Sequence, residues 1–108
     1  MKTLTPIGIR KQATRFVDSL AGAAYEIDGS VKNIDLFRTS IDDDGTVKVY
    51  VYFDDSVSGT MGQIRLIDRD GDVVALADRA FVKPASKGLY VAFKYKFVEM
   101  EDDTDVGL

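Results

Sequence analysis

Two segments of strict alternation constrain the fold of this chain more than any other feature. In residues 47–53 the apolar side chains Val47, Val49, Val51 and Phe53 alternate with Lys48, Tyr50 and Tyr52. Residues 89–98 repeat the pattern with apolar or aromatic residues at every odd position from 91 to 97. A period of two, rich in β-branched and aromatic residues, predicts half-buried β-strands. Shorter strands are predicted at 24–28, 31–37, 62–68 and 73–78.

Turn-forming dipeptides separate these segments. They are Asp28-Gly29, Asp44-Gly45, Ser58-Gly59, Asp70-Gly71 and Lys87-Gly88. Asp70-Gly71 lies between two predicted strands and predicts a tight hairpin. The glycines on either side of Met61 predict a flexible loop or a strand bulge, because no Lys-Ser/Thr pair follows to make a phosphate loop.

The first twenty residues have a different period. Thr5 and Pro6 form a helix-start signal, because Thr caps free N–H groups and Pro is tolerated at the first helical position. Apolar residues then recur every three or four positions, at Ile9, Ala13, Phe16, Val17 and Leu20. This spacing predicts an amphipathic helix, with Ala21-Gly22 as its stop. The sequence therefore predicts an α+β fold in which one N-terminal helix packs on a mainly antiparallel β-sheet or sandwich. Residues 1–98 are expected to form a single domain and residues 99–108 an acidic, disordered tail.

Composition removes most enzyme classes. Among 108 residues there is no Cys and no His. Disulfides, thiolate zinc sites, imidazole metal ligands and His-dependent triads are therefore excluded. The adjacent acids Asp54-Asp55 and the run 42–44 fall in predicted turns, whereas glycoside hydrolysis needs two carboxylates held across a cleft. We expect no enzymatic activity and no cofactor.

The charge balance of the chain is mildly acidic. It has 14 basic and 18 acidic residues, a net charge of −4, which argues against nucleic-acid binding. We expect no membrane span and no signal peptide, because no apolar run approaches the ~18–20 residues that a span needs. The first 17 residues carry only basic charge and the last ten only acidic charge. These ends either meet, within one molecule or between neighbours, or remain as solvated charge, and the second alternative is the more common.

Two groups of residues are candidate sites. Asp68, Asp70 and Asp72 are weak candidates for calcium, but their spacing does not match an EF-hand loop, and a structural turn is the favoured interpretation. A basic and tyrosine-rich set predicts a protein or sugar partner, because Tyr gives rigid amphipathic contact area. The alternative for its strand residues is a second core or an ordinary wet sheet, and this alternative is the more common. This partner-binding set is Arg10, Lys11, Arg15, Lys48, Tyr50, Tyr52, Lys94 and Lys96.

The order of four short motifs resembles a known family. Leu4-Thr-Pro-Ile-Gly8 leads through the helix to Leu20-Ala-Gly22, and Gly62-Gln-Ile-Arg-Leu-Ile-Asp-Arg-Asp-Gly71 and Lys83-Pro-Ala-Ser86 precede the last alternating strand. In this order the chain resembles the tail-collar-type N-terminal attachment domains of bacteriophage tail-fibre and baseplate proteins. The resemblance implies an oligomeric, often trimeric, attachment domain with no catalytic residues.

We therefore expect a non-enzymatic structural or adaptor protein of a phage or prophage tail or baseplate. Its expected partners are other tail or baseplate subunits and further copies of itself, with a trimer favoured. It would be made in the bacterial cytoplasm and carried in the virion tail. The alternative is a small carbohydrate- or peptide-binding β-module.

Overall fold

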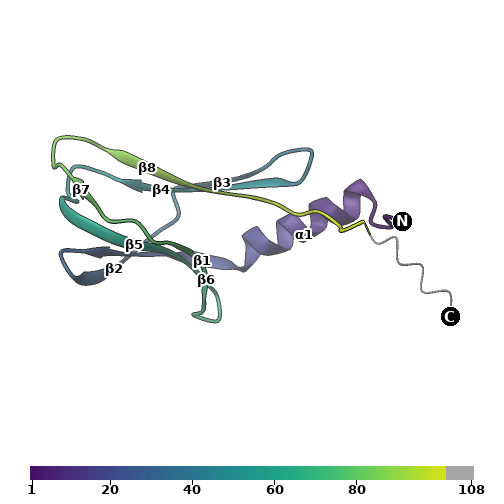
Figure 1. Ribbon diagram of the computed structural model, residues 1–108, viewed down its shortest axis with the longest axis horizontal. Helices are drawn as coiled ribbons and strands as arrows, with labels where there is room; N and C mark the ends of the chain where they lie inside the picture. The colour runs from purple at the N-terminus through teal and green to yellow at the C-terminus, as the bar shows by residue number, and fades with distance from the viewer. Residues whose placement is uncertain (102–108) are drawn as a thin grey trace.

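The computed structural model describes residues 1–101 and confirms the predicted α+β fold. A single helix begins the chain and strands follow it in the described part (Figure 1). The elements are α1 (Pro6–Ser19), β1 (Leu20–Ile27), β2 (Ser30–Ile34), β3 (Arg38–Ile41), β4 (Thr46–Phe53), β5 (Gly59–Asp68), β6 (Val73–Ala77), β7 (Phe81–Lys83) and β8 (Leu89–Lys96).

The strands form two antiparallel sheets that pack face to face. The five-stranded sheet has the order β2-β1-β5-β6, and β7 pairs with the other half of β5. The three-stranded sheet has the order β3-β4-β8. Tyr25 of β1 and Phe53 of β4 meet between the sheets, with ring centroids 5.0 Å apart and a T-shaped angle of 73°. The arrangement is a β-sandwich with its core between the two layers (Figure 1).

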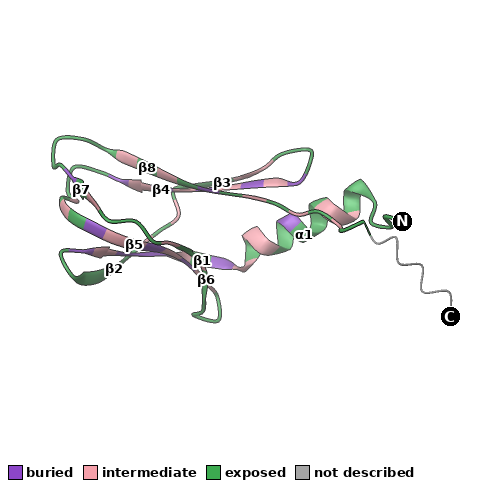
Figure 2. Ribbon diagram, in the orientation of Figure 1, coloured by how far each residue is buried: buried purple, intermediate pink, exposed green. Residues whose placement is uncertain are grey.

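The apolar residues that alternate along β4 lie in the core, as the sequence predicted. Val47, Val49, Val51 and Phe53 are fully buried, and the residues between them are half-buried on the other face (Figure 2). On the opposing sheet, Met61, Ile64 and Leu66 of β5 are buried. The spacing of Met61 and Ile64 breaks the period of two because the ladder between β1 and β5 shifts register there. The strand bulge expected around Met61 is therefore present.

The helix α1 packs on the end of the three-stranded sheet. Thr5 caps it, since its Oγ1 accepts a hydrogen bond from the Gly8 N–H at 3.0 Å, and Pro6 occupies the first turn. Ala13 is fully buried, and the Phe16 ring lies 5.6 Å from Tyr95 and 5.5 Å from Phe97. Figure 1 shows α1 beyond the end of β1, alongside the segment that follows β8.

The predicted end of the helix is wrong. The helix ends at Ser19, and Ala21-Gly22 lies inside β1. Leu20 takes an extended conformation, buries its side chain and pairs with Asp68 of β5. Sheet pairing and core burial therefore end the helix before the glycine is reached.

Strand boundaries also differ from the prediction: β1 begins at Leu20 and β5 at Gly59, earlier than the predicted starts at residues 24 and 62. β2 ends at Ile34, whereas the sequence predicted a strand to residue 37, and the short strands β3 and β7 were not predicted. The hairpin at Asp70-Gly71 is confirmed: the Asp68 N–H donates to the Asp72 carbonyl at 3.0 Å, and Gly71 has a φ of +85°. Lys83 of β7 is buried, and its Nζ donates to the Val57 carbonyl at 2.6 Å.

The two ends of the described chain lie together. The Glu99 carboxylate accepts backbone N–H bonds from Thr3 at 2.8 Å and from Leu4 at 2.6 Å. The N-terminal amine of Met1 lies 3.0 Å from Glu101. The charged ends thus meet within the molecule at these residues, through backbone N–H groups and the terminal amine. The rest of the tail predicted to be disordered, residues 102–108, lies outside the described residues.

This contact predicts a pH dependence. The backbone N–H groups of Leu4 and Thr3 lower the pKa of Glu99 below its ordinary value. A carboxylate with a lowered pKa stabilises the fold above the ordinary glutamate pKa, about 4.3, and loses that contribution as the pH falls through the lowered value. We expect the amide NMR signals of Thr3 and Leu4 to shift with a midpoint below 4.3. In a Glu99→Gln variant both shifts should be absent, and a midpoint at or above 4.3 would contradict the contact.

Candidate binding surface

The outer face of the three-stranded sheet collects most of the predicted partner-binding residues. In the ladder between β4 and β8, Lys48 lies opposite Lys94 and Tyr52 lies opposite Tyr90. Tyr50 is flanked by Ala92 on one side and by Arg38 of β3 on the other. Directly opposed residues of an antiparallel pair point to the same face, so the strand residues of the set share one surface.

Aromatic rings form a cluster at one end of this face. Phe37, Tyr52 and Tyr90 contact one another, with ring centroids 4.5 Å apart for Tyr52–Tyr90, 5.3 Å for Phe37–Tyr90 and 5.6 Å for Phe37–Tyr52. The Phe37 N–H donates to the Tyr50 carbonyl at 2.8 Å, which fixes the segment that carries the ring. Phe37 is 54% exposed and Tyr90 58% exposed. We call these three residues the aromatic cluster.

Gly88 makes room for the Tyr52 ring of the aromatic cluster, because it has no side chain. A Cβ at this position would lie 2.9 Å from the Tyr52 ring. Glycine therefore allows the chain before β8 to pass directly against Tyr52. The Tyr52 ring is half-buried by this approach, whereas Phe37 and Tyr90 keep about half of their surface open.

Lysines occupy the other end of the face. Lys48 pairs with Asp42 at 3.4 Å and Lys96 pairs with Asp44 at 3.7 Å. These pairs are largely exposed and contribute little to stability. Lys94 makes no ion pair within residues 1–101. The surface therefore joins a ring cluster to an end of mixed charge, in which Lys94 is the lysine without an ion pair among residues 1–101. This combination suits a partner with apolar and polar groups.

The basic residues of the helix do not join this surface. Arg10, Lys11 and Arg15 are exposed on α1, which packs against the inner side of the three-stranded sheet through Phe16 and Tyr95. The sequence named these cations as partner contacts without assigning them to a face, and that role stays a prediction. Sequence reasoning missed Phe37, whose position in a predicted strand gave no sign that the ring lies beside Tyr52.

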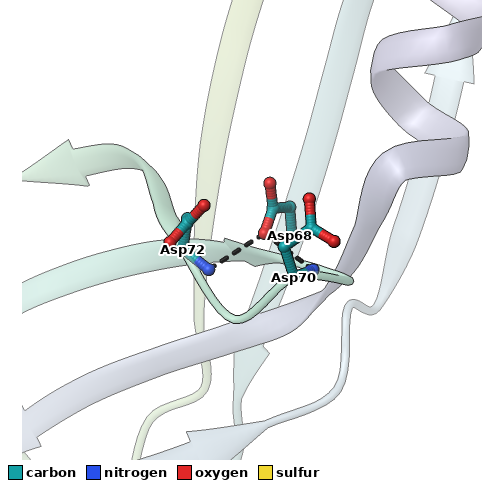
Figure 3. A group of neighbouring side chains, drawn as sticks. All are labelled: Asp68, Asp70 and Asp72. Carbon is teal, nitrogen blue, oxygen red and sulfur yellow. Dashed lines mark hydrogen bonds between the residues drawn. The ribbon is translucent and has the colours of Figure 1, made fainter.

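The three aspartates of the β5–β6 hairpin come together, as Figure 3 shows. One carboxylate oxygen from each of Asp68, Asp70 and Asp72 lies within 4.8 Å of the others. The Asp68 Oδ1 accepts the backbone N–H bonds of Asp70 at 3.0 Å and Asp72 at 2.9 Å. These two hydrogen bonds close the turn, so the position of Asp68 is accounted for by the turn, without a bound ion.

The remaining adjacent acids are also turn residues. The Asp54 carboxylate accepts hydrogen bonds from the side chain and the backbone N–H of Ser56, and these bonds lower its pKa. Hydrogen bonds from Thr46 lower the pKa of Asp44 in the same way, with a smaller contribution from Lys96. A general acid at neutral pH needs a raised pKa, so both shifts run in the opposite direction.

No family model matches the chain, and no curated protein or solved structure matches it. The resemblance to tail-collar-type domains stays a prediction. Within the described residues, the only helix is too short and too polar to cross a membrane.

Proposed function

We propose that the chain is a non-enzymatic assembly module of a phage or prophage tail or baseplate, and that it docks onto neighbouring subunits through the outer face of its three-stranded sheet. The observation that carries the docking role is the exposed aromatic cluster beside the lysines of β4 and β8. Aromatic residues near the centre of an interface contribute most of its binding energy, and a charged rim sets the partner and the orientation. The phage context comes from the sequence resemblance.

If the outer face docks onto a neighbouring subunit, truncating its exposed rings should lower the affinity for that subunit. The chain would be produced together with tail and baseplate subunits encoded by the same genome, and dissociation constants measured for each pair. Truncating Tyr52 and Tyr90 together to alanine is expected to weaken the binding of one such subunit by at least about tenfold. Both rings lie on the outer face, so the variant should keep its fold by circular dichroism.

The matched control is Leu76→Ala, which removes a half-exposed apolar side chain from the other sheet. It should leave the affinity unchanged. Equal losses in the control and the double variant would contradict docking through the outer face. Failure of every subunit to bind would overturn the proposed role.

Glycan binding is the second candidate, and the same cluster favours it. Exposed tyrosine rings present apolar faces with a hydroxyl at the edge, which suits the C–H faces of sugars. A glycan array would show binding that disappears when Tyr52 and Tyr90 are replaced by alanine. A blank array with intact subunit binding would remove this candidate.

A further inference from the structure

The free edge of β8 is the feature that the docking role does not use. β8 pairs with β4 over eight residues without a register shift, and no strand within residues 1–101 pairs with its other edge. Edge strands are commonly protected by proline, by a bulge, by an inward charge or by lysines, and β8 has lysines at positions 94 and 96. Residues 89–93 of β8 carry none of these. The backbone on this side is therefore free to pair with another strand.

An apolar pocket runs beside this edge. It has a volume of about 500 Å³ and opens between β8 and the β6–β7 side of the five-stranded sheet. Its lining includes the charged Arg79 and the apolar residues Ile64, Ala77, Phe81, Leu89, Val91 and Phe93. A strand added to β8 would place its own inward side chains over this pocket. Such pairing would bury apolar surface as well as satisfy the backbone.

The sequence of β8 is complementary to itself. Antiparallel pairing of two copies with Ala92 opposite Ala92 sets Val91 against Phe93 on the inner face, and Leu89 against Tyr95. On the outer face, Tyr90 lies opposite Lys94 of the second copy, where the ammonium group can meet the face of the ring. Because the pairing is two-fold symmetric, each of these contacts occurs twice.

The register with Ala92 opposite Ala92 also keeps the lysines of the two copies apart. Lys94 of the two copies are offset by four residues, about 13 Å along the strands, which exceeds the screening length of about 8–10 Å at ordinary salt. Lys96 falls opposite Gly88. A register shifted by four residues, which moves the two-fold axis to residue 94, would instead set Lys94 directly against Lys94, which is unfavourable.

We propose that the occupant of this edge is a second copy of the chain, which pairs β8 with β8 about a two-fold axis at Ala92. The two three-stranded sheets then form one continuous sheet of six strands. Its outer face carries two aromatic clusters. This dimer differs in symmetry from the trimer that the resemblance implies, and its test uses the chain alone, so it can fail while the docking role stands.

Engineered cysteines test the register, because the natural chain has none. Opposed residues of an antiparallel pair have Cα atoms about 4.5–5.5 Å apart, within the range for a disulfide. The Ala92→Cys variant should form a covalent dimer under mild oxidation. The matched Lys94→Cys variant, two residues along the same face, should not. Equal cross-linking of both variants, or none of Ala92→Cys, would overturn the proposal.

Light scattering across a range of concentrations tests the dimer without cross-linking. The unmodified chain should approach twice the mass of one chain as concentration rises. Ala92→Lys places two like charges at the axis and should raise the dimer dissociation constant by about fivefold. Ala92 is exposed, so the variant should remain folded. A monomer at every concentration, or a trimer, would contradict the edge-paired dimer.

Discussion

Replacing Phe53 by alanine is expected to lower the free energy of unfolding by about 3–5 kcal/mol. Phe53 is fully buried at the end of β4, where its ring packs against Tyr25 of the opposing sheet. Truncation removes a ring contact between the two layers and leaves a cavity in the core they share, which a β-sandwich cannot close easily. Urea unfolding followed by circular dichroism would measure the change.

The matched control is Phe37→Ala, the same substitution at a ring that is half exposed on the outer face. It is expected to cost about 1 kcal/mol or less, since little buried area is lost. Similar losses for the two variants would show that the core does not lie between the sheets as described.

Replacing Gly59 by alanine should cost roughly 3 kcal/mol of unfolding free energy. Gly59 begins β5 with a φ of +128°, and a Cβ there would lie 2.8 Å from the Asp28 Cγ. The Asp28 carboxylate also accepts the Thr60 N–H at 2.9 Å, so moving it aside would break one of the two hydrogen bonds between Asp28 and Thr60 that join the β1–β2 turn to β5. The free-energy costs of backbone strain and of the lost hydrogen bond therefore add together in the Gly59→Ala variant.

Gly71→Ala is the control for this prediction. Gly71 has a φ of +85°, but a Cβ there would meet nothing within 4 Å. It should cost about 1–2 kcal/mol from the left-handed conformation alone. A Gly59→Ala variant no less stable than Gly71→Ala would contradict the packing at Asp28. Thermal melts of both variants under one buffer would compare them directly.

The sequence predicts the strands of the sandwich correctly where alternating apolar residues are bounded by turn-forming dipeptides. The alternation of β4 and β8 gave both the strands and their buried faces, and Asp70-Gly71 gave the hairpin between β5 and β6. The helix end was missed because the signal of Gly22 is local, whereas Leu20 is held by pairing with Asp68 nearly fifty residues away. Non-local pairing overrides a local stop signal, and one sequence does not reveal it.

The candidate surface was predictable only in part. The alternation placed Lys48, Tyr50 and Tyr52 on one face, and Lys94 and Lys96 on another, but only the sheet order shows that the two faces adjoin. The sequence predicted Phe37 as the last residue of a strand, but that strand ends at Ile34, and Phe37 joins the aromatic cluster from the connection between the two sheets. Arg10, Lys11 and Arg15 lie on α1, away from this surface, and their predicted contact with a partner stays a prediction.

The proposed role rests on the outer face being buried in an assembled tail, and mass spectrometry of purified phage particles tests this most directly. Particles would be produced from the genome that encodes the chain, with either the natural sequence or the variant with alanine at positions 52 and 90. We expect the natural chain at a fixed ratio to the other tail proteins and the variant strongly depleted. Particles that lack the natural chain, or that hold both forms equally, would contradict the account.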